Sequence, residues 1–255
     1  MAIAAPTPHS VPVDGGHLHV GVWPGGDDVV LAIHGGTSSH VVWSTIVAEL
    51  AGAATVIAPD IRGAALSENV GPPYGLRAHT DDMRRVLDHF AVDRAVITGW
   101  SLGGFIAANA AAALASQVVA MVLVDGGLPL PLPTDFDPLV VVDQLIEPAR
   151  QHARDGDLPA PVNFAAMRAD VIDTLTGETR EAVLRVGAPM SFVWAERGLQ
   201  GEPTGYYPLA AVHDFAKIHP LRIAEGHGLD HFELMQSAAG ATLVADELRW
   251  ALSTA

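Results

Sequence analysis

The stretch "VITGWSLGGF", Val96 to Phe105, contains the change of pattern that decides the fold of this chain. Its first residues are apolar and typical of a buried strand, whereas the alanine-rich segment Phe105–Leu114 is typical of a helix. Only a tight turn separates the two, and Ser101 lies at its apex between Gly99 and Gly103. Gly-x-Ser-x-Gly between a strand and a helix is the pattern of a nucleophile elbow.

The spacing of this motif has a physical reason. In such a turn the serine adopts a strained backbone conformation that lifts its hydroxyl clear of the sheet. The residues two positions away must be small because their backbones crowd together, and Gly99 and Gly103 meet that condition. The helix that follows Ser101 directs its first backbone N–H groups toward developing negative charge. A simple strand-to-helix turn is the alternative, but the context on both sides favours a nucleophile.

Short apolar runs alternate with helical segments on both sides of this turn, which predicts an α/β fold with a mostly parallel central sheet. Strands buried on both faces are expected within Asp28–Gly36, Thr55–Gly63, Arg94–Ser101, Val118–Gly127, Pro189–Gly198 and Pro220–His227. Helices are expected over Trp43–Leu50, Leu76–Phe90, Leu102–Ala115 and Ala239–Leu252. Alternation of polar and apolar residues around His17, His19 and Gly21 predicts an antiparallel hairpin at one edge of the sheet.

The segment Leu128–Ala188 interrupts this alternation and is too long for an ordinary loop. It opens with "LPLPLPTDFDP", whose prolines oppose regular structure. Amphipathic helices are expected around Leu139–Arg154, Phe164–Thr176 and Glu178–Val186. We therefore predict that residues 1–127 and 188–255 form the core and that residues 128–187 form a helical cap inserted into it.

The charge and composition exclude several classes of function. The 255 residues carry a formal net charge of −15, and Lys217 is the only lysine, so binding to nucleic acid or to an anionic membrane is not expected. The absence of cysteine removes disulfides, thiolate metal sites and a cysteine nucleophile. No signal peptide is recognised, and a cytoplasmic location is expected. The uncharged run Ala95–Val124 is long enough to span a bilayer, but its glycines and polar residues favour strand, turn, helix and strand.

Four motifs in this order resemble those of the α/β-hydrolase fold family, and the resemblance covers essentially the whole chain. They are "LAIHGGTSSHVVW", similar to a His-Gly oxyanion loop, "APDIRGAALS", similar to an Asp-x-Arg-Gly turn, the elbow "GWSLGG", and "GLDHFELM", similar to the histidine loop before the last helix. The resemblance implies a serine hydrolase with a catalytic triad and a small helical cap.

The resemblance also implies an oxyanion hole. Its donors would be the backbone N–H of Leu102, next to the nucleophile, and that of Gly36 in the His-Gly loop. His34, Asp60 and Arg62 are interpreted as residues that brace these turns. The Asp-x-Arg-Gly motif usually continues with His-Gly, but this chain has Ala64 and Ala65 there.

Two histidines are candidates for the general base. Both His227 and His231 lie in "AEGHGLDHFELM", and a preceding glycine favours His227. The position one short loop before the C-terminal helix, followed by Phe232, favours His231, which we predict to be the general base. Their His-x-x-x-His spacing also fits a metal pair, but no third ligand or helix supports that interpretation, and no metal or cofactor is expected.

The acid of the triad is where the chain departs from the family pattern. In this sequence "AERG" occupies the position of the usual Gly-x-x-Asp, so Gly198 stands where aspartate is expected. Asp125, which closes the strand after the elbow helix, and Glu196, two residues early at the usual strand, are the candidates. We favour Asp125 because some family members carry the acid there and because it can orient the far nitrogen of the histidine. A turn or helix-cap role is the alternative for Asp125.

The expected function is hydrolysis of a carboxylic ester or lactone of a small to medium hydrophobic substrate through an acyl-enzyme on Ser101. Two alternatives are hydrolysis of a carbon–carbon bond in a ketone-type substrate by the same triad and a non-catalytic ligand-binding role. Haloalkane dehalogenase and epoxide hydrolase chemistry are disfavoured, because family members of those classes carry aspartate at the elbow.

Several other side chains are candidates to line the pocket, although each can equally be part of the hydrophobic core. They are Val140, Val141, Leu145, Phe164 and Met167 in the cap, together with Trp43 and Trp100. His40 is interpreted as an exposed loop histidine, with a substrate contact as the alternative.

Overall fold

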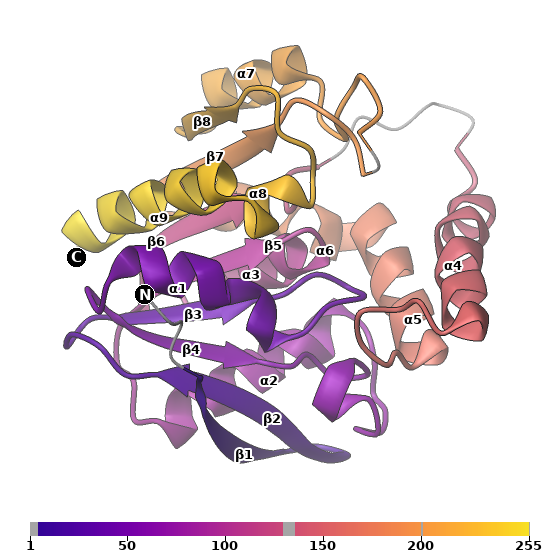
Figure 1. Ribbon diagram of the computed structural model, residues 1–255, viewed down its shortest axis with the longest axis horizontal. Helices are drawn as coiled ribbons and strands as arrows, with labels where there is room; N and C mark the ends of the chain where they lie inside the picture. The colour runs from indigo at the N-terminus through magenta and orange to yellow at the C-terminus, as the bar shows by residue number, and fades with distance from the viewer. Residues whose placement is uncertain (1–4, 130–135, 200, 255) are drawn as a thin grey trace.

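The computed structural model describes residues 5–129, 136–199 and 201–254, which form an eight-stranded sheet with helices on both faces (Figure 1). The strand order is β1-β2-β4-β3-β5-β6-β7-β8. The strands β1 (Thr7–Val13) and β2 (Gly16–Trp23) form the antiparallel hairpin predicted at one edge. The others, parallel to one another, are β3 (Val29–Ile33), β4 (Thr55–Pro59), β5 (Ala95–Trp100), β6 (Val118–Val124), β7 (Met190–Ala195) and β8 (Arg222–Gly226).

The continuous apolar runs exist because each central strand is covered on both faces. Successive side chains of a strand point to opposite faces, and in β5 Val96 and Ile97 accordingly belong to two different hydrophobic clusters. One cluster packs against α1 (Ser44–Leu50), α8 (Glu233–Gln236) and α9 (Ala238–Ser253). The other packs against α2 (Leu76–His89), α3 (Leu102–Ala113) and α7 (Leu209–Ile218). The predicted α/β class and parallel sheet are confirmed.

Most of the predicted elements agree with the structure to within a few residues, and two differ in kind. A 3₁₀ turn, His40–Trp43, precedes α1, where the sequence predicted one helix from Trp43. The predicted helix Glu178–Val186 is divided into α6 (Gly177–Arg180) and a 3₁₀ turn, Ala182–Arg185. The helix is interrupted between Arg180 and Ala182, and Val183 just beyond the interruption is buried in one of the two hydrophobic clusters. Tertiary packing therefore overrides the helical pattern of the sequence.

The inserted segment between β6 and β7 is helical as expected. The helix α4 (Pro138–Asp155) begins where the Asp137 carboxylate accepts a hydrogen bond from the backbone N–H of Leu139, and it ends at Gly156. The helix α5 (Phe164–Leu175) begins at Asn163, whose side chain accepts from two backbone N–H groups. Part of the proline-rich stretch, residues 130–135, lies outside the described residues. The division into core and cap at residues 128–187 stays a prediction.

Two carboxylates fasten the inserted segment to the core. Asp170 and Asp173, both on α5, accept hydrogen bonds from the backbone N–H groups of Gly75 and Leu76 at distances of 3.1 and 2.9 Å. These N–H groups belong to the start of α2, where orphan donors and the helix dipole favour negative charge. His79, also on α2 and fully buried, forms an ion pair with Asp170 over 3.0 Å.

The apolar run Ala95–Val124 forms β5, α3 and β6. Across residues 5–129, 136–199 and 201–254, no helix is both long and apolar enough to cross a membrane.

The buried His79–Asp170 pair predicts a pH-dependent contribution to stability. Burial alone would lower the pKa of His79, but Asp170, with Asp82 nearby, outweighs burial and the Arg62 charge and raises it above 6.5. A raised folded-state pKa means that the stabilisation is complete below pH 6.5 and is lost as the pH rises through the folded value.

We therefore expect H79Q to lower the free energy of unfolding by about 3 kcal/mol at pH 6 and by less at pH 9. Urea unfolding of wild type and variant at both pH values measures the difference. A destabilisation that is the same at both would contradict this role.

Candidate active site

Ser101 stands at a strained turn between β5 and α3. Its backbone has φ 57° and ψ −123°, a conformation that non-glycine residues rarely adopt. The turn requires glycine on either side, since a Cβ on Gly99 would lie 2.0 Å from the carbonyl oxygen of Gly103. A Cβ on Gly103 would lie 2.2 Å from that of Ile33. The strain and the glycines together support the elbow predicted from the sequence.

Asp125 follows β6, and its turn lies directly beside that of Ser101. A Cβ on Gly126 would lie 2.1 Å from the carbonyl oxygen of Ser101, so the two turns are in backbone contact. The Asp125 side chain is buried, and its Oδ2 lies 2.7 Å from Nδ1 of His231. Its other oxygen accepts a longer hydrogen bond, 3.4 Å, from the backbone N–H of Ala195. Because a carboxylate can only accept, Nδ1 of His231 carries the proton in this pair.

Aromatic residues hold the ring of His231 in place. The ring lies 5.0 Å from that of Trp100 and contacts Tyr206 and Phe232 edge to face at 5.3 and 5.6 Å. The indole N–H of Trp100 also donates to the backbone carbonyl of His231 over 3.2 Å. Trp100 is therefore a buried core residue that orients the histidine, and Trp43 is likewise buried.

The other two candidates for base and acid form different contacts. The side chain of His227 is 65% exposed and lies 2.8 Å from Glu225. Glu196 accepts a hydrogen bond of 2.6 Å from the backbone N–H of Gly228. Of the four candidates, the structure brings together His231 and Asp125.

The two predicted oxyanion donors line one cavity with the serine. Gly36, Leu102 and Ser101 all form part of its wall, and Leu102 is the first residue of α3. His34 braces the glycine loop, because its Nε2 accepts a hydrogen bond of 3.0 Å from the backbone N–H of Ile61. Burial lowers the pKa of His34 to about 4, so the ring is neutral at neutral pH and can accept that bond.

The expected bracing roles of Asp60 and Arg62 agree with their contacts. The Arg62 guanidinium forms a buried, two-bond ion pair with Asp82 at 2.6 and 2.9 Å. Asp60 accepts hydrogen bonds from the backbone N–H groups of His40 and Leu66. Both residues therefore fix the turn that follows β4.

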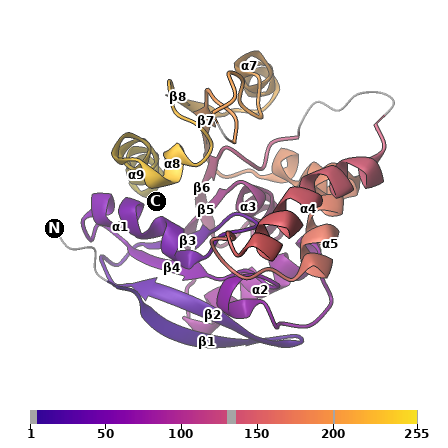
Figure 2. The same cartoon turned by 45° about the vertical axis from the view of Figure 1, so that its right-hand side comes forward.

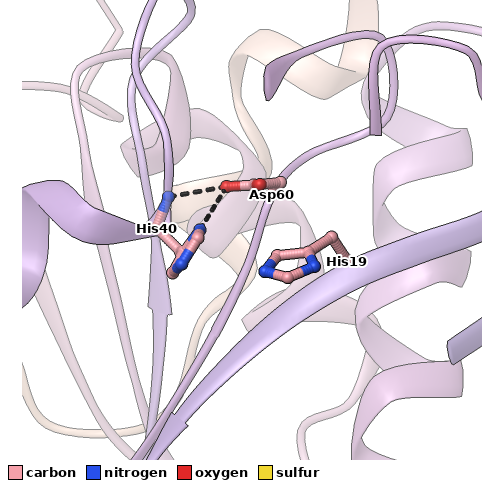
Figure 3. Close-up of side chains that lie close together, drawn as sticks. All are labelled: His19, His40 and Asp60. Atoms are coloured by element: carbon pink, nitrogen blue, oxygen red, sulfur yellow. Dashed lines mark hydrogen bonds and ion pairs between the residues drawn. The ribbon is translucent and has the colours of Figure 1, made fainter. Parts of the chain in front are cut away.

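The interpretation of His40 as an exposed loop histidine is wrong. Its side chain is 8% exposed, and its Nδ1 lies 2.9 Å from Asp60 (Figure 3). The reason is the neighbouring strand β2, where Gly21 leaves room for the ring: a Cβ at that position would lie 2.4 Å from Cδ2 of His40.

A cavity of about 440 Å³ joins the serine to the inserted helices. Figures 1 and 2 show α4 and α5 together beside the sheet, and both contribute residues to the cavity wall. Among the predicted lining residues, Leu145 and Met167 line it, whereas Val141 and Phe164 pack within the inserted segment and Val140 is 52% exposed. The wall contains no arginine or lysine, and the residues outside the described ranges include none either.

Tyr206 is a cavity residue that the sequence reasoning missed. It lies in the loop after β7, contacts His231 and lines the cavity. Burial, followed by the charges of Asp125 and Glu202, raises its pKa, so the phenol stays neutral and can donate a hydrogen bond. The signal was the pair "YY" in a loop at the carboxyl end of a strand, where ligand contacts are common in parallel sheets.

Comparison with known proteins decides the family. A sequence profile described as alpha/beta hydrolase fold matches residues 28–159, slightly more than half of the chain. The chain belongs to the α/β-hydrolase fold family. An uncharacterized protein of Mycobacterium tuberculosis is 34% identical over 103 residues, which cover 40% of this chain and 30% of that relative. The match thus spans under a third of the length of this relative.

Two solved structures share the fold over nearly the full length of the α/β-hydrolase chain. E-2-(acetamidomethylene)succinate hydrolase has a TM-score of 0.73 at 22% identity and covers 97% of this chain and 100% of its own. The enol-lactonase from Burkholderia xenovorans has a TM-score of 0.73 at 17% identity, with 96% and 100% covered. At these identities the likeness shows the fold alone.

The contact between Gly126 and the elbow yields a second prediction. In G126A the added methyl meets a backbone carbonyl that cannot move cheaply, so we expect a loss of about 1–3 kcal/mol in unfolding free energy. The matched control is G187A, because no atom lies within 4 Å of a Cβ there. We expect it to be neutral or slightly stabilising. Urea unfolding measures both, and equal effects would contradict the argument.

Proposed function

We propose that the protein hydrolyses carboxylic esters or lactones of small to medium neutral, hydrophobic substrates through an acyl-enzyme on Ser101. The observation that carries the proposal is the buried hydrogen bond between Asp125 and His231 next to a strained serine turn. A serine alone is a weak nucleophile, and a base oriented by a carboxylate is the arrangement that activates it.

The proposed mechanism follows from where the protons lie. Nδ1 of His231 is engaged with Asp125, so the lone pair of Nε2 is free to take the Ser101 hydroxyl proton as the oxygen attacks the carbonyl carbon. The resulting oxyanion accepts hydrogen bonds from the backbone N–H groups of Gly36 and Leu102. The imidazolium then protonates the leaving alcohol oxygen. Water, deprotonated by the same nitrogen, attacks the acyl carbon and releases the acid and Ser101.

The wall of the cavity supports a neutral substrate. Its charged or ionisable members include the carboxylates of Asp125 and Asp157 and the imidazole of His152, with no permanent cation. A substrate carboxylate entering this cavity would lose water without gaining a guanidinium or ammonium partner. The likeness to an enol-lactonase supports a lactone among the candidate substrates, whereas the substrate class in the name of the succinate hydrolase fits this wall poorly.

The assignment of the triad is tested with p-nitrophenyl butyrate and single variants. We expect S101A, D125N and H231Q each to lower kcat by about 10³-fold or more. The matched controls E196Q and H227Q replace the alternative acid and base and should retain nearly full turnover.

A loss of activity with E196Q but not with D125N would identify Glu196, which follows β7, as the acid in place of Asp125. Absence of Ser101-dependent turnover, together with no covalent labelling of Ser101 by a fluorophosphonate, would contradict the proposal. In that case carbon–carbon substrates or a binding role would be tested next.

The proposed substrate charge is tested with two esters of equal chain length. The p-nitrophenyl monoester of succinic acid differs from p-nitrophenyl butyrate by a terminal carboxylate. We expect its kcat/KM to be at least about 10-fold lower, because the charge is desolvated without a partner. Equal or faster hydrolysis of the succinate ester would contradict the neutral-substrate assignment while leaving the triad intact.

A further inference from the structure

Two imidazoles and a carboxylate converge outside the catalytic cavity (Figure 3). His19 comes from β2, His40 from the 3₁₀ turn before α1, and Asp60 from the end of β4. One potential ligand atom from each of the three lies within 4.8 Å of the others. None of these residues lines the cavity that contains Ser101, and the mechanism above does not use them.

The carboxylate of Asp60 is fully buried and has no permanent cation beside it. Its Oδ1 accepts from the backbone N–H and from Nδ1 of His40 at 2.7 and 2.9 Å, and lies 3.8 Å from Nε2 of His34. The nearby guanidinium of Arg62 is occupied by Asp82. Burial alone would raise the pKa of Asp60, but contacts with His40 and His34 outweigh it and lower the pKa. The group is therefore a buried carboxylate at neutral pH, compensated within the described residues by imidazoles and backbone amides.

Of the two imidazoles beside this carboxylate, that of His40 is tightly packed, whereas that of His19 is partly exposed. The ring of His40 fills the space over Gly21 and packs near Trp23, with 6.1 Å between ring centroids. The ring of His19 lies 4.8 Å from that of His40 and is partly exposed. A neutral imidazole has one ring nitrogen with a lone pair, which His19 can offer as a ligand.

We propose that His19, His40 and Asp60 form a binding site for a divalent transition-metal ion of the zinc class. Two neutral imidazole nitrogens and one carboxylate oxygen are ligands that such ions prefer, whereas magnesium and calcium prefer oxygen alone. On binding through Nδ1 of His40, the ion takes the place of the Nδ1 proton, which moves to Nε2 so that the imidazole stays neutral. The ion also supplies the positive charge that the buried carboxylate lacks.

The geometry needs one adjustment. Ligand atoms on a four-coordinate zinc ion lie roughly 3.3 Å apart, since each bond is about 2.0–2.2 Å long. The His40–Asp60 pair already matches this spacing at 2.9 Å. His19, the exposed member, must therefore rotate toward the pair, and water completes the coordination.

A second group of residues could capture the same ions and must be controlled. His227 and His213 both lie near Glu225, at 2.8 and 3.7 Å, and the two histidine side chains are exposed. Exposed histidine pairs of this kind bind zinc-class metals without forming a built site. The experiment is therefore carried out in the H227Q background as well as in the wild-type chain.

The test measures binding of ZnCl₂ by titration calorimetry and binding of CoCl₂ by visible absorption. A strong visible absorption of the bound cobalt ion indicates a low coordination number. We expect one ion per chain in the wild type and the same stoichiometry in H227Q. H19Q, which alters a partly exposed side chain and preserves the fold, should weaken binding by at least about 10-fold. The matched control H17Q, two residues away on the same strand and exposed, should leave binding unchanged.

A second measurement tests the same site through stability. The unfolding temperature should rise on addition of ZnCl₂ in wild type and H17Q but not in H19Q, because an ion that binds only the folded state stabilises it. The absence of saturable binding at neutral pH would overturn the proposal. Equal affinity in wild type and H19Q, or loss of binding in H227Q alone, would overturn it as well.

Discussion

The close approach of backbones around Ser101 is the constraint on which the rest of the candidate site depends. Four glycines, Gly99, Gly103, Gly104 and Gly126, lie where an added Cβ would meet a neighbouring main-chain atom at 2.0–2.5 Å. This contact joins the end of β5, the first turn of α3 and the end of β6 into one rigid unit. The unit holds Ser101 at positive φ, and it places Asp125, also at positive φ, on the neighbouring turn. Main-chain packing of this kind positions the proposed catalytic groups more precisely than contacts between flexible side chains.

The same constraint places Asp125, the proposed acid, after β6 and within reach of the histidine loop. The histidine loop between β8 and α8 carries His231 back over Trp100, and the Asp125 carboxylate meets Nδ1 there. Glu196, at the strand where the family pattern usually has the acid, instead holds the turn at Gly228. The loop that bears the histidine is thus supported from β7 while the hydrogen bond to the ring comes from β6. The residue after β6 thus contacts the histidine ring, and the residue after β7 contacts the backbone of the loop that carries it.

Much of this arrangement was predictable from sequence because it depends on local rules. Apolar runs of strand length, glycines at fixed offsets from Ser101, and the order of the four motifs identified the sheet, the elbow and the candidate residues. The sequence favoured His231 over His227 by its position before the C-terminal helix, and the folded chain shows the ring of His231 beside Asp125. The burial of His40 was not predictable, since it depends on Gly21 of a strand distant in the sequence. Tyr206 contacts His231 through a similar long-range approach of two loops.

The cluster around Asp60 connects two parts of the molecule that the mechanism treats separately. His34, whose loop carries the proposed oxyanion donor Gly36, lies 3.8 Å from the Asp60 oxygen that His40 also contacts. A change of charge at His19 or His40 therefore acts on a residue adjacent to the glycine loop without crossing the hydrophobic core. The low pKa of His34 keeps that imidazole neutral, so it can accept the hydrogen bond from the backbone N–H of Ile61 beside the proposed metal site.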